Sequence, residues 1–160
     1  MRKILAAVAL VMGVACAQNT VILVRHAERA SARMSDKDLG LSDAGKKRAD
    51  ELARVLGDAG IQAIYTSDAP RTIQTAEPLA RRLKLTPREM NDPNAIVKDI
   101  EAHSDRTVLV VHHSNTLPKI LERLGVKNAP AIGESQYDWL FVVSIDMHGD
   151  AKLLALHYGT

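Results

Sequence analysis

The chain has 160 residues, which is enough for one domain with its own core. It carries 21 Lys and Arg against 19 Asp and Glu. Arg2 and Lys3 account for that excess, so residues 18–160 are formally neutral and give no argument for nucleic-acid binding or for attraction to a membrane surface. The single cysteine is Cys16, which excludes disulfides, thiol nucleophiles and Cys-based zinc sites from residues 18–160.

Residues 1–17 have the composition of a cleaved signal peptide. Arg2 and Lys3 precede an apolar run at residues 4–14, and small residues of the A-x-A type follow it. That run is shorter than the roughly 20 residues that cross a bilayer as a helix. We therefore expect cleavage after Ala17, export to the periplasm or the medium, and no stable membrane insertion. Two alternatives are less favoured: a lipoprotein signal with Cys16 as the lipidated residue, and a buried N-terminal helix.

The first predicted elements alternate between strand and helix. Residues 20–24 form an apolar run rich in β-branched side chains, which is typical of a strand buried on both faces. Ser42 is a candidate cap for a helix whose apolar side chains recur at the spacing of one helical face until Gly57. Residues 61–65 predict a second strand.

The alternation continues through the middle of the chain. A helix is predicted over residues 70–83, and Pro78 within it is expected to bend or shorten it. A short extended piece at residues 86–89 precedes a helix at residues 94–102. Residues 107–111 predict another buried strand.

The last part of the chain predicts one more helix and two strands. Ser114 or Asn115 can cap that helix, and Gly125 ends it. Residues 139–145 and 153–157 then predict a terminal β-hairpin or a pair of neighbouring strands.

This order of elements predicts an α/β domain at residues 18–160. Strands that alternate with helices form a mostly parallel central sheet with helices on both faces, a three-layer α/β/α arrangement. The terminal strands are expected to add an antiparallel edge. Ligands bind such sheets beyond the carboxyl ends of the strands. Functional residues should therefore follow the predicted strands.

Residues suited to phosphate chemistry follow three of these strands. Arg25 and His26 come after the first strand, Arg71 after the second, and His112 and His113 after the fourth. Arginine presents paired donors to phosphate oxygens, and positioned cations stabilise the charge of a phosphoryl group in transfer. A neutral imidazole is a nucleophile when an acceptor holds the proton of its other nitrogen. Together these residues predict phosphoryl transfer.

These segments resemble the histidine phosphatase superfamily, also called the phosphoglycerate mutase-like family. The similar segments are VILVRHAE at residues 21–28, LSDAGKKRAD at 41–50, TSDAPRTIQTA at 66–76 and VVHHSNT at 110–116, together with the closing strand pair. The resemblance implies a cofactor-independent phosphatase without a metal, in which His26 is the nucleophile. It also implies that Arg25, Arg71 and His113 are catalytic residues that hold the phosphoryl oxygens of the substrate.

Two positions depart from the family pattern, and a third is ambiguous. Ala27 and His112 stand where the family usually has glycine. Neighbouring strand residues point to opposite faces, so His112 and His113 should not both face the site unless the strand has ended. Glu28 is a candidate acid, or it pairs with Arg29 or Arg33 on a loop.

The donor of the leaving-group proton has no motif. The resemblance implies that enzymes acting on esters take a carboxylate from the region between the second and fourth strands, where Glu89, Asp92 and Asp99 are the candidates. Phosphohistidine is cleaved without such an acid. The segment between the second helix and the fourth strand is short, so the pocket should be open. Phosphorylated small molecules and phosphoproteins thus both remain candidate substrates.

Two other functions remain as alternatives. A metal-dependent phosphohydrolase could use His26, His113 and a carboxylate as ligands, although the neighbouring arginines would repel a cation. The second alternative is a non-catalytic exported domain, which would bind phosphate through the same arginines but would not turn over a substrate. The other histidines, His103, His148 and His157, are expected at the surface or at an edge.

Overall fold

The computed structural model describes residues 18–30 and 39–159. The predicted signal peptide, with Cys16, and Arg33 lie outside these residues. The elements along the chain are β1 (Asn19–Arg25), α1 (Asp43–Leu56), β2 (Ile61–Thr66), α2 (Pro70–Leu83), β3 (Arg88–Glu89), α3 (Pro93–Glu101), β4 (Thr107–His112), α4 (Leu117–Arg123), β5 (Trp139–Ile145) and β6 (Ala151–His157). None of the helices described is long and apolar enough to span a membrane.

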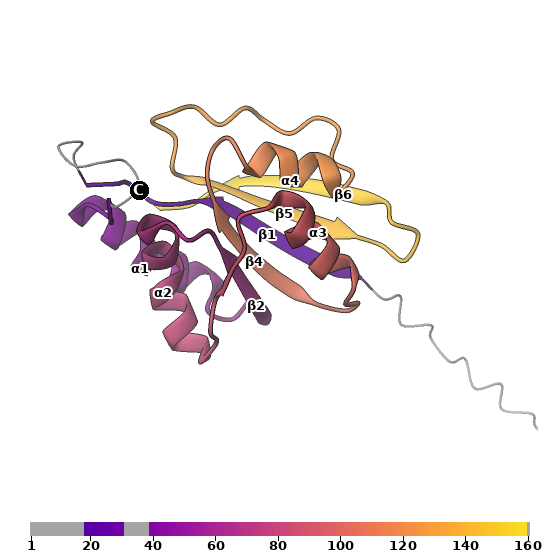
Figure 1. The fold of residues 1–160 in the computed structure, drawn as a ribbon, viewed down its shortest axis with the longest axis horizontal. Helices are drawn as coiled ribbons and strands as arrows, with labels where there is room; N and C mark the ends of the chain where they lie inside the picture. Colours follow the sequence, from indigo (N-terminus) through magenta and orange to yellow (C-terminus); the bar gives the residue numbers. More distant parts are fainter. Residues whose placement is uncertain (1–17, 31–38, 160) are drawn as a thin grey trace, which may run out of the picture.

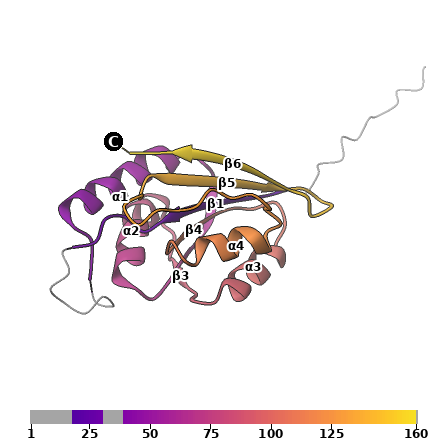
Figure 2. The same ribbon diagram turned by 90° about the horizontal axis from the view of Figure 1, so that it is seen from above.

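The strands form one six-stranded sheet in the order β3-β2-β4-β1-β5-β6. The pairs β3–β2, β2–β4 and β4–β1 are parallel. β5 runs antiparallel to β1, and β6 runs antiparallel to β5. Helices α1 and α2 lie side by side over one face, and α3 and α4 lie over the other (Figures 1 and 2). The predicted three-layer α/β fold, with its terminal antiparallel strands, is confirmed.

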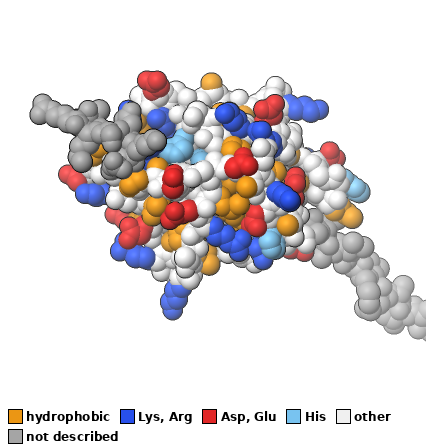
Figure 3. Space-filling model, viewed as in Figure 1, with side chains coloured by type: hydrophobic (Ala, Val, Ile, Leu, Met, Phe, Trp, Pro, Cys, Tyr) orange, Lys and Arg blue, Asp and Glu red, His pale blue; other side chains and the backbone are white. Residues whose placement is uncertain are grey.

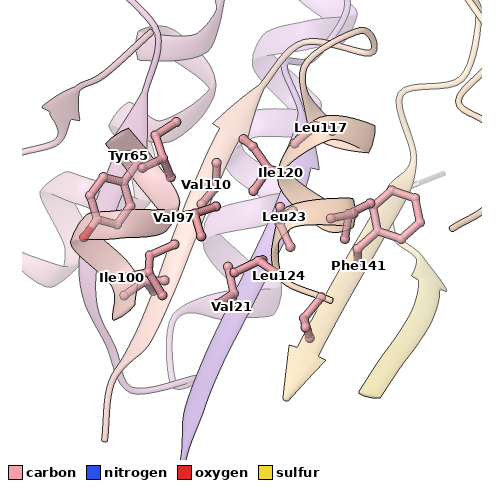
Figure 4. Close-up of a cluster of buried hydrophobic side chains, with 14 of the residues drawn as sticks. Val21, Leu23, Tyr65, Val97, Ile100, Val110, Leu117, Ile120, Leu124 and Phe141 are labelled. Carbon is pink, nitrogen blue, oxygen red and sulfur yellow. The ribbon is translucent and has the colours of Figure 1, made fainter. Parts of the chain in front are cut away.

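Strand β1 is buried on both faces because its side chains alternate between the two cores. Val21 and Leu23 pack toward α3 and α4, whereas Ile22 and Val24 pack toward α1 and α2. Figure 4 shows the first of these cores, where Ile120 and the other apolar side chains of α4 lie against the central strands. This double burial explains why residues 21–24 lack polar side chains.

Two local predictions need comment. Pro78 does not shorten α2, which continues to Leu83. The predicted cap of α4 is wrong, since Thr116 occupies that position and makes no side-chain capping bond. The turn before the helix closes on the carbonyl of His113, which accepts from the N–H groups of Thr116 and Leu117 at 3.0 and 2.9 Å. Ser114 and Asn115 therefore belong to the turn.

Helix α1 is held against the segment that follows β1. Ser42 caps the helix by accepting from the Gly45 N–H at 3.1 Å, and its own N–H donates to the Glu28 carbonyl at 2.9 Å. Gly45 faces that same carbonyl so closely that a Cβ atom at this position would overlap it. The lack of a side chain at Gly45 thus lets α1 approach residues 26–29.

Replacing Gly45 with Ala should lower the free energy of unfolding by about 1–3 kcal/mol, the usual cost of overpacking. Helix propensity acts in the opposite direction, since Ala is favoured over Gly by about 1 kcal/mol within a helix. Urea unfolding measures the change. The control is Gly57→Ala, whose Cβ would meet only the flexible end of the Arg82 side chain. If both variants are as stable as the wild type, the proposed close approach of α1 is wrong.

Candidate active site

The parallel pairing of β1 with β4 places the two predicted histidines together. Arg25 and His112 are partners at the carboxyl ends of these strands, and the His26 N–H donates to the His112 carbonyl at 2.8 Å. A histidine follows each of these two residues, His26 after Arg25 and His113 after His112. The ring centroids of His26 and His113 are 5.4 Å apart. Both rings line a cavity of about 410 Å³. The residues that line it are Arg25, His26, Arg29, Arg71, His113, Ser114, Asn115, Thr116, Glu134 and Tyr137.

Arg25 is held by the loop that precedes β5. Its Nη1 donates to the carbonyls of Gly133, Glu134 and Gln136 at 2.9, 2.7 and 3.1 Å. The Tyr137 ring lies 4.2 Å from its Cζ, close enough for a cation–π interaction. Burial lowers the pKa of Arg25, and the carbonyl oxygens and the ring replace the water that this cation loses. The guanidinium is therefore fixed at the edge of the cavity.

His26 is 5% exposed and is oriented by the backbone. Its Nδ1 lies 2.8 Å from the Ala27 carbonyl, which can only accept, so this nitrogen carries the proton and Nε2 has a free lone pair. Burial is the main cause that lowers the pKa of His26 to about 3, with further lowering by Arg71, His113 and Arg25. The Ala27 hydrogen bond acts in the opposite direction. His26 is thus a neutral imidazole at pH 7.

His113 lies between a cation and a buried hydroxyl. Its Nδ1 is 3.4 Å from Nη2 of Arg71, and its Nε2 is 2.9 Å from the Ser67 hydroxyl. Burial first, and then the charge of Arg71, lower the pKa of His113 to about 4. Arg71 is the second residue of α2, directly after Pro70. The site therefore joins Arg25, His26, Arg71 and His113, as predicted, although the separation along the chain is large.

His112 points to the other side of β4 and does not line the cavity. It is 2% exposed, and its Nε2–H donates to the Met90 carbonyl at 3.1 Å, while burial lowers its pKa. β4 ends at His112, so His113 already belongs to the following turn. The two adjacent histidines accordingly occupy different environments.

Glu28 lies outside this cavity. Arg48 binds its carboxylate with Nε at 3.0 Å from both oxygens and Nη2 at 2.8 Å from one of them. Arg48 was not among the partners considered from the sequence, which were Arg29 and Arg33, and Arg33 lies outside the described residues. The placement favours a structural role for Glu28, which ties α1 to the segment after His26.

The three carboxylates between β2 and β4 are also placed elsewhere. Asp92 caps α3 through the Asn94 N–H, and Asp99 accepts from the Tyr65 hydroxyl at 2.6 Å and from Arg88 at 2.9 Å. Glu89 is exposed on β3. None of the three lines the cavity.

Several residues of the cavity were not identified from the sequence. Arg29 follows His26 by three positions and adds a third arginine, directly after the segment VILVRHAE, which ends at Glu28. Glu134 and Tyr137 lie in a loop without a sequence pattern, so only the fold brings them near β1. Ser67 contacts His113 from the end of β2 and was likewise missed.

The described part of the chain holds no cluster of metal-ligating side chains, and the face seen in one view (Figure 3) mixes charges of both signs. In residues 18–30 and 39–159, no three His, Cys, Asp or Glu side chains are grouped closely enough to bind a metal ion. The face drawn in Figure 3 mixes Lys and Arg with Asp and Glu, without a large area of positive charge. The positive charge near the cavity instead comes from Arg25, Arg29 and Arg71.

Residues 21–92 match the model of the histidine phosphatase superfamily (branch 1). These residues include Arg25, His26 and Arg71. Over these residues, the chain is similar to the histidine phosphatase superfamily. No curated protein matches its sequence. The resemblance predicted from the motifs is confirmed, and the superfamily supports a phosphatase activity.

Solved structures of superfamily members have the same fold. A protein described as a phosphohistidine phosphatase SixA from Agrobacterium tumefaciens is 25% identical, with a TM-score of 0.65 over 88% of this chain and 98% of that one. The protein histidine phosphatase SixA complexed with tungstate is 19% identical, with a TM-score of 0.73 over 86% and 96%. A mycobacterial glucosyl-3-phosphoglycerate phosphatase is 18% identical, with a TM-score of 0.71 over 89% and 100%.

The buried neutral histidines should make the protein less stable in mild acid. The pKa values of His26 and His113 are about 3 and 4 in the folded chain, against 6.5 for an unperturbed histidine. Below pH 6.5 the unfolded chain binds more protons, so the free energy of unfolding falls as the pH falls from 6.5 toward 4. Each such group contributes up to about 1.4 kcal/mol per pH unit.

Urea unfolding at several pH values between 4.5 and 7.5 tests this. His26→Gln should show a shallower fall than the wild type because one buried histidine is missing. His148→Gln, at an exposed turn, is the control and should follow the wild type. Equal slopes for His26→Gln and the wild type would contradict the assignment of His26 as a neutral group in the folded state.

Proposed function

We propose that this protein is a phosphatase that passes the phosphoryl group of its substrate to Nε2 of His26 and then to water. The observation that carries the proposal is the state of His26. The Ala27 carbonyl holds the Nδ1 proton, burial keeps the ring neutral, and Arg25 and Arg71 line the same cavity. A nucleophilic lone pair thus lies where two arginines can bind phosphoryl oxygens.

The reaction then has two steps. Nε2 of His26 attacks phosphorus, the new N–P bond forms as the bond to the leaving group breaks, and the leaving group departs with the bonding electrons. Arg25 and Arg71 stabilise the negative charge on the phosphoryl oxygens, and His113 lies where it can donate to them. Water next attacks phosphorus, which releases inorganic phosphate and frees His26. In both steps the protein positions the reacting groups and supplies the positive charge that stabilises the phosphoryl oxygens.

Replacing His26 with Ala should lower turnover of an aryl phosphate by at least about 10³-fold, since the nucleophile is lost. Wild-type enzyme quenched during turnover should carry phosphate that is labile to acid and stable to base, as expected for phosphohistidine. The variant should carry none. His148→Ala is the control, because this exposed side chain lies away from the cavity. Near wild-type turnover by His26→Ala would refute the proposal.

The cavity offers few residues that could bind the leaving group of the substrate or protonate it. Glu134 is the one carboxylate among the cavity residues described, and it is exposed; the contact it makes with Arg25 uses its backbone carbonyl. No residue between α2 and β4 lines the cavity, so this segment does not cover the site. We therefore propose phosphohistidine on a protein as the favoured substrate. Imidazole needs little help to leave, and a site that the described segment between α2 and β4 does not cover can admit a protein.

The named neighbours support both this substrate and its main alternative. Two of them are described as SixA phosphohistidine or protein histidine phosphatases. Another is a glucosyl-3-phosphoglycerate phosphatase, which acts on a phosphate ester. If residues 1–17 direct export as predicted, the substrate is met outside the cytoplasm. Among the described residues, no group of three or more His, Cys, Asp or Glu side chains favours the metal-dependent alternative.

A comparison of leaving groups separates these substrates. We expect kcat/KM for a phosphohistidine peptide to exceed that for an alkyl phosphate by at least about 100-fold, since general acid catalysis contributes about 10²–10⁴-fold where an acid is present. Glu134→Gln should change the phosphohistidine rate by less than about threefold. Equal rates for both substrates, together with a selective loss of alkyl phosphate hydrolysis in Glu134→Gln, would instead identify an ester phosphatase with Glu134 as its acid.

A further inference from the structure

Two buried hydroxyl groups lie behind His113, on the side away from Arg71. Ser67 follows β2 and is 2% exposed, and Thr72 lies in the first turn of α2 and is fully buried. The Ser67 Oγ is 2.9 Å from Nε2 of His113 and 2.9 Å from the Thr72 Oγ1. The Thr72 Oγ1 is in turn 2.8 Å from the Ala69 carbonyl. The imidazole, the two hydroxyls and the carbonyl thus form one chain of hydrogen bonds.

The two ends of this chain determine its direction. The Ala69 carbonyl can only accept, so the Thr72 hydroxyl donates to it. Thr72 then accepts from the Ser67 hydroxyl, and Ser67 accepts from Nε2–H of His113. At the other side of the ring, the Arg71 guanidinium can only donate, which requires Nδ1 of His113 to be the acceptor. Both ends therefore give His113 the same tautomer, with its proton on Nε2.

We propose that Ser67, held by Thr72, is a positioning residue that determines which nitrogen of His113 meets the phosphoryl group. With Nε2–H bound to Ser67, the nitrogen that remains on the Arg71 side is Nδ1. Phosphoryl oxygens only accept, so Nδ1 has to take up a proton before it can donate to them. Ser67 can accept from Nε2–H in both states, and so it stabilises the imidazolium that forms when the phosphoryl group is bound. This inference rests on the proposed function.

The groups around His113 agree with proton uptake on binding. Arg71, Arg25 and the neighbouring His112 disfavour a charge on His113 in the free site, and Asp68 favours one. His26 faces it from the end of β1 and is neutral. A phosphoryl dianion adds negative charge next to the ring and reverses this balance. Binding of phosphate should therefore take up a proton and weaken as the pH rises.

Three variants test the role of the hydroxyl chain. Ser67→Ala removes the acceptor of Nε2–H. Thr72→Val keeps nearly the same shape but removes the acceptor of the Ser67 hydroxyl, which can then turn and donate to His113. Thr66→Val is the matched control, because the Thr66 hydroxyl is equally buried and has no hydrogen-bond partner. Ser67→Thr restores a hydroxyl and should recover most of what Ser67→Ala loses.

The decisive measurements are ¹⁵N NMR of the His113 ring and binding of inorganic phosphate from pH 5 to 8, with urea unfolding to show that each variant is folded. The free wild type should have the proton on Nε2, and Ser67→Ala and Thr72→Val should show mixed tautomers. We expect Ser67→Ala to bind phosphate about 10–100-fold more weakly, with its pH dependence moved to lower pH, since a hydrogen bond to a charged group is lost. Thr66→Val should bind as the wild type does.

Folded Ser67→Ala and Thr72→Val proteins with the wild-type tautomer and phosphate affinity would overturn the inference. If Ser67→Ala does not fold, Thr72→Val decides by the same criteria. The tautomer is measured in the free protein without turnover, whereas the phosphohistidine trap reports on His26. A failure of the positioning role is therefore distinguishable from a failure of the proposed function.

Discussion

The site depends on the parallel register between β1 and β4. This register makes Arg25 and His112 partners, and the hydrogen bond from the His26 N–H to the His112 carbonyl continues the pairing by one residue. A shift of one residue would turn every side chain of β1 to the opposite face. Such a shift would exchange Val21 and Leu23, which pack toward α3 and α4, with Ile22 and Val24, which pack toward α1 and α2, and both cores would have to repack. Packing of the apolar strand thus positions the polar residues that follow it.

The parallel register also brings several arginines together, and their mutual repulsion would destabilise the fold if nothing compensated it. Arg25, Arg29 and Arg71 line one cavity, and the two histidines beside them stay neutral because burial and the arginines disfavour their protonation. The protein offsets part of the cost locally, since loop carbonyls and the Tyr137 ring surround the Arg25 guanidinium. An anionic phosphoryl group would offset more of it. The proposed affinity for phosphate and the predicted acid sensitivity of the free protein therefore have one electrostatic origin.

The fold and the four central residues could be predicted because their signals are local. The apolar run before Arg25 and the cap at Ser42 are visible in a few neighbouring residues, and the strand ends then place Arg25, His26, Arg71 and His113 by the geometry of a parallel sheet. The contacts of Glu28, Ser67 and Tyr137 could not be predicted in this way. They depend on the position of α1, on the end of β2 and on the loop before β5, which are set by packing between segments distant in the chain.

His112 shows how one site tolerates a departure from the family pattern. In the family that the chain resembles, this position usually has glycine, and a bulky polar side chain there could be expected to disturb His113. In this chain the side chain points across β4, and its Nε2–H reaches the Met90 carbonyl just after β3. That bond connects β4 to a segment that β3 itself holds by only two residue pairs. Because the strand ends at His112, the ring of His113 turns independently into the cavity. The His112 side chain therefore supports the sheet, while His113 still lines the cavity.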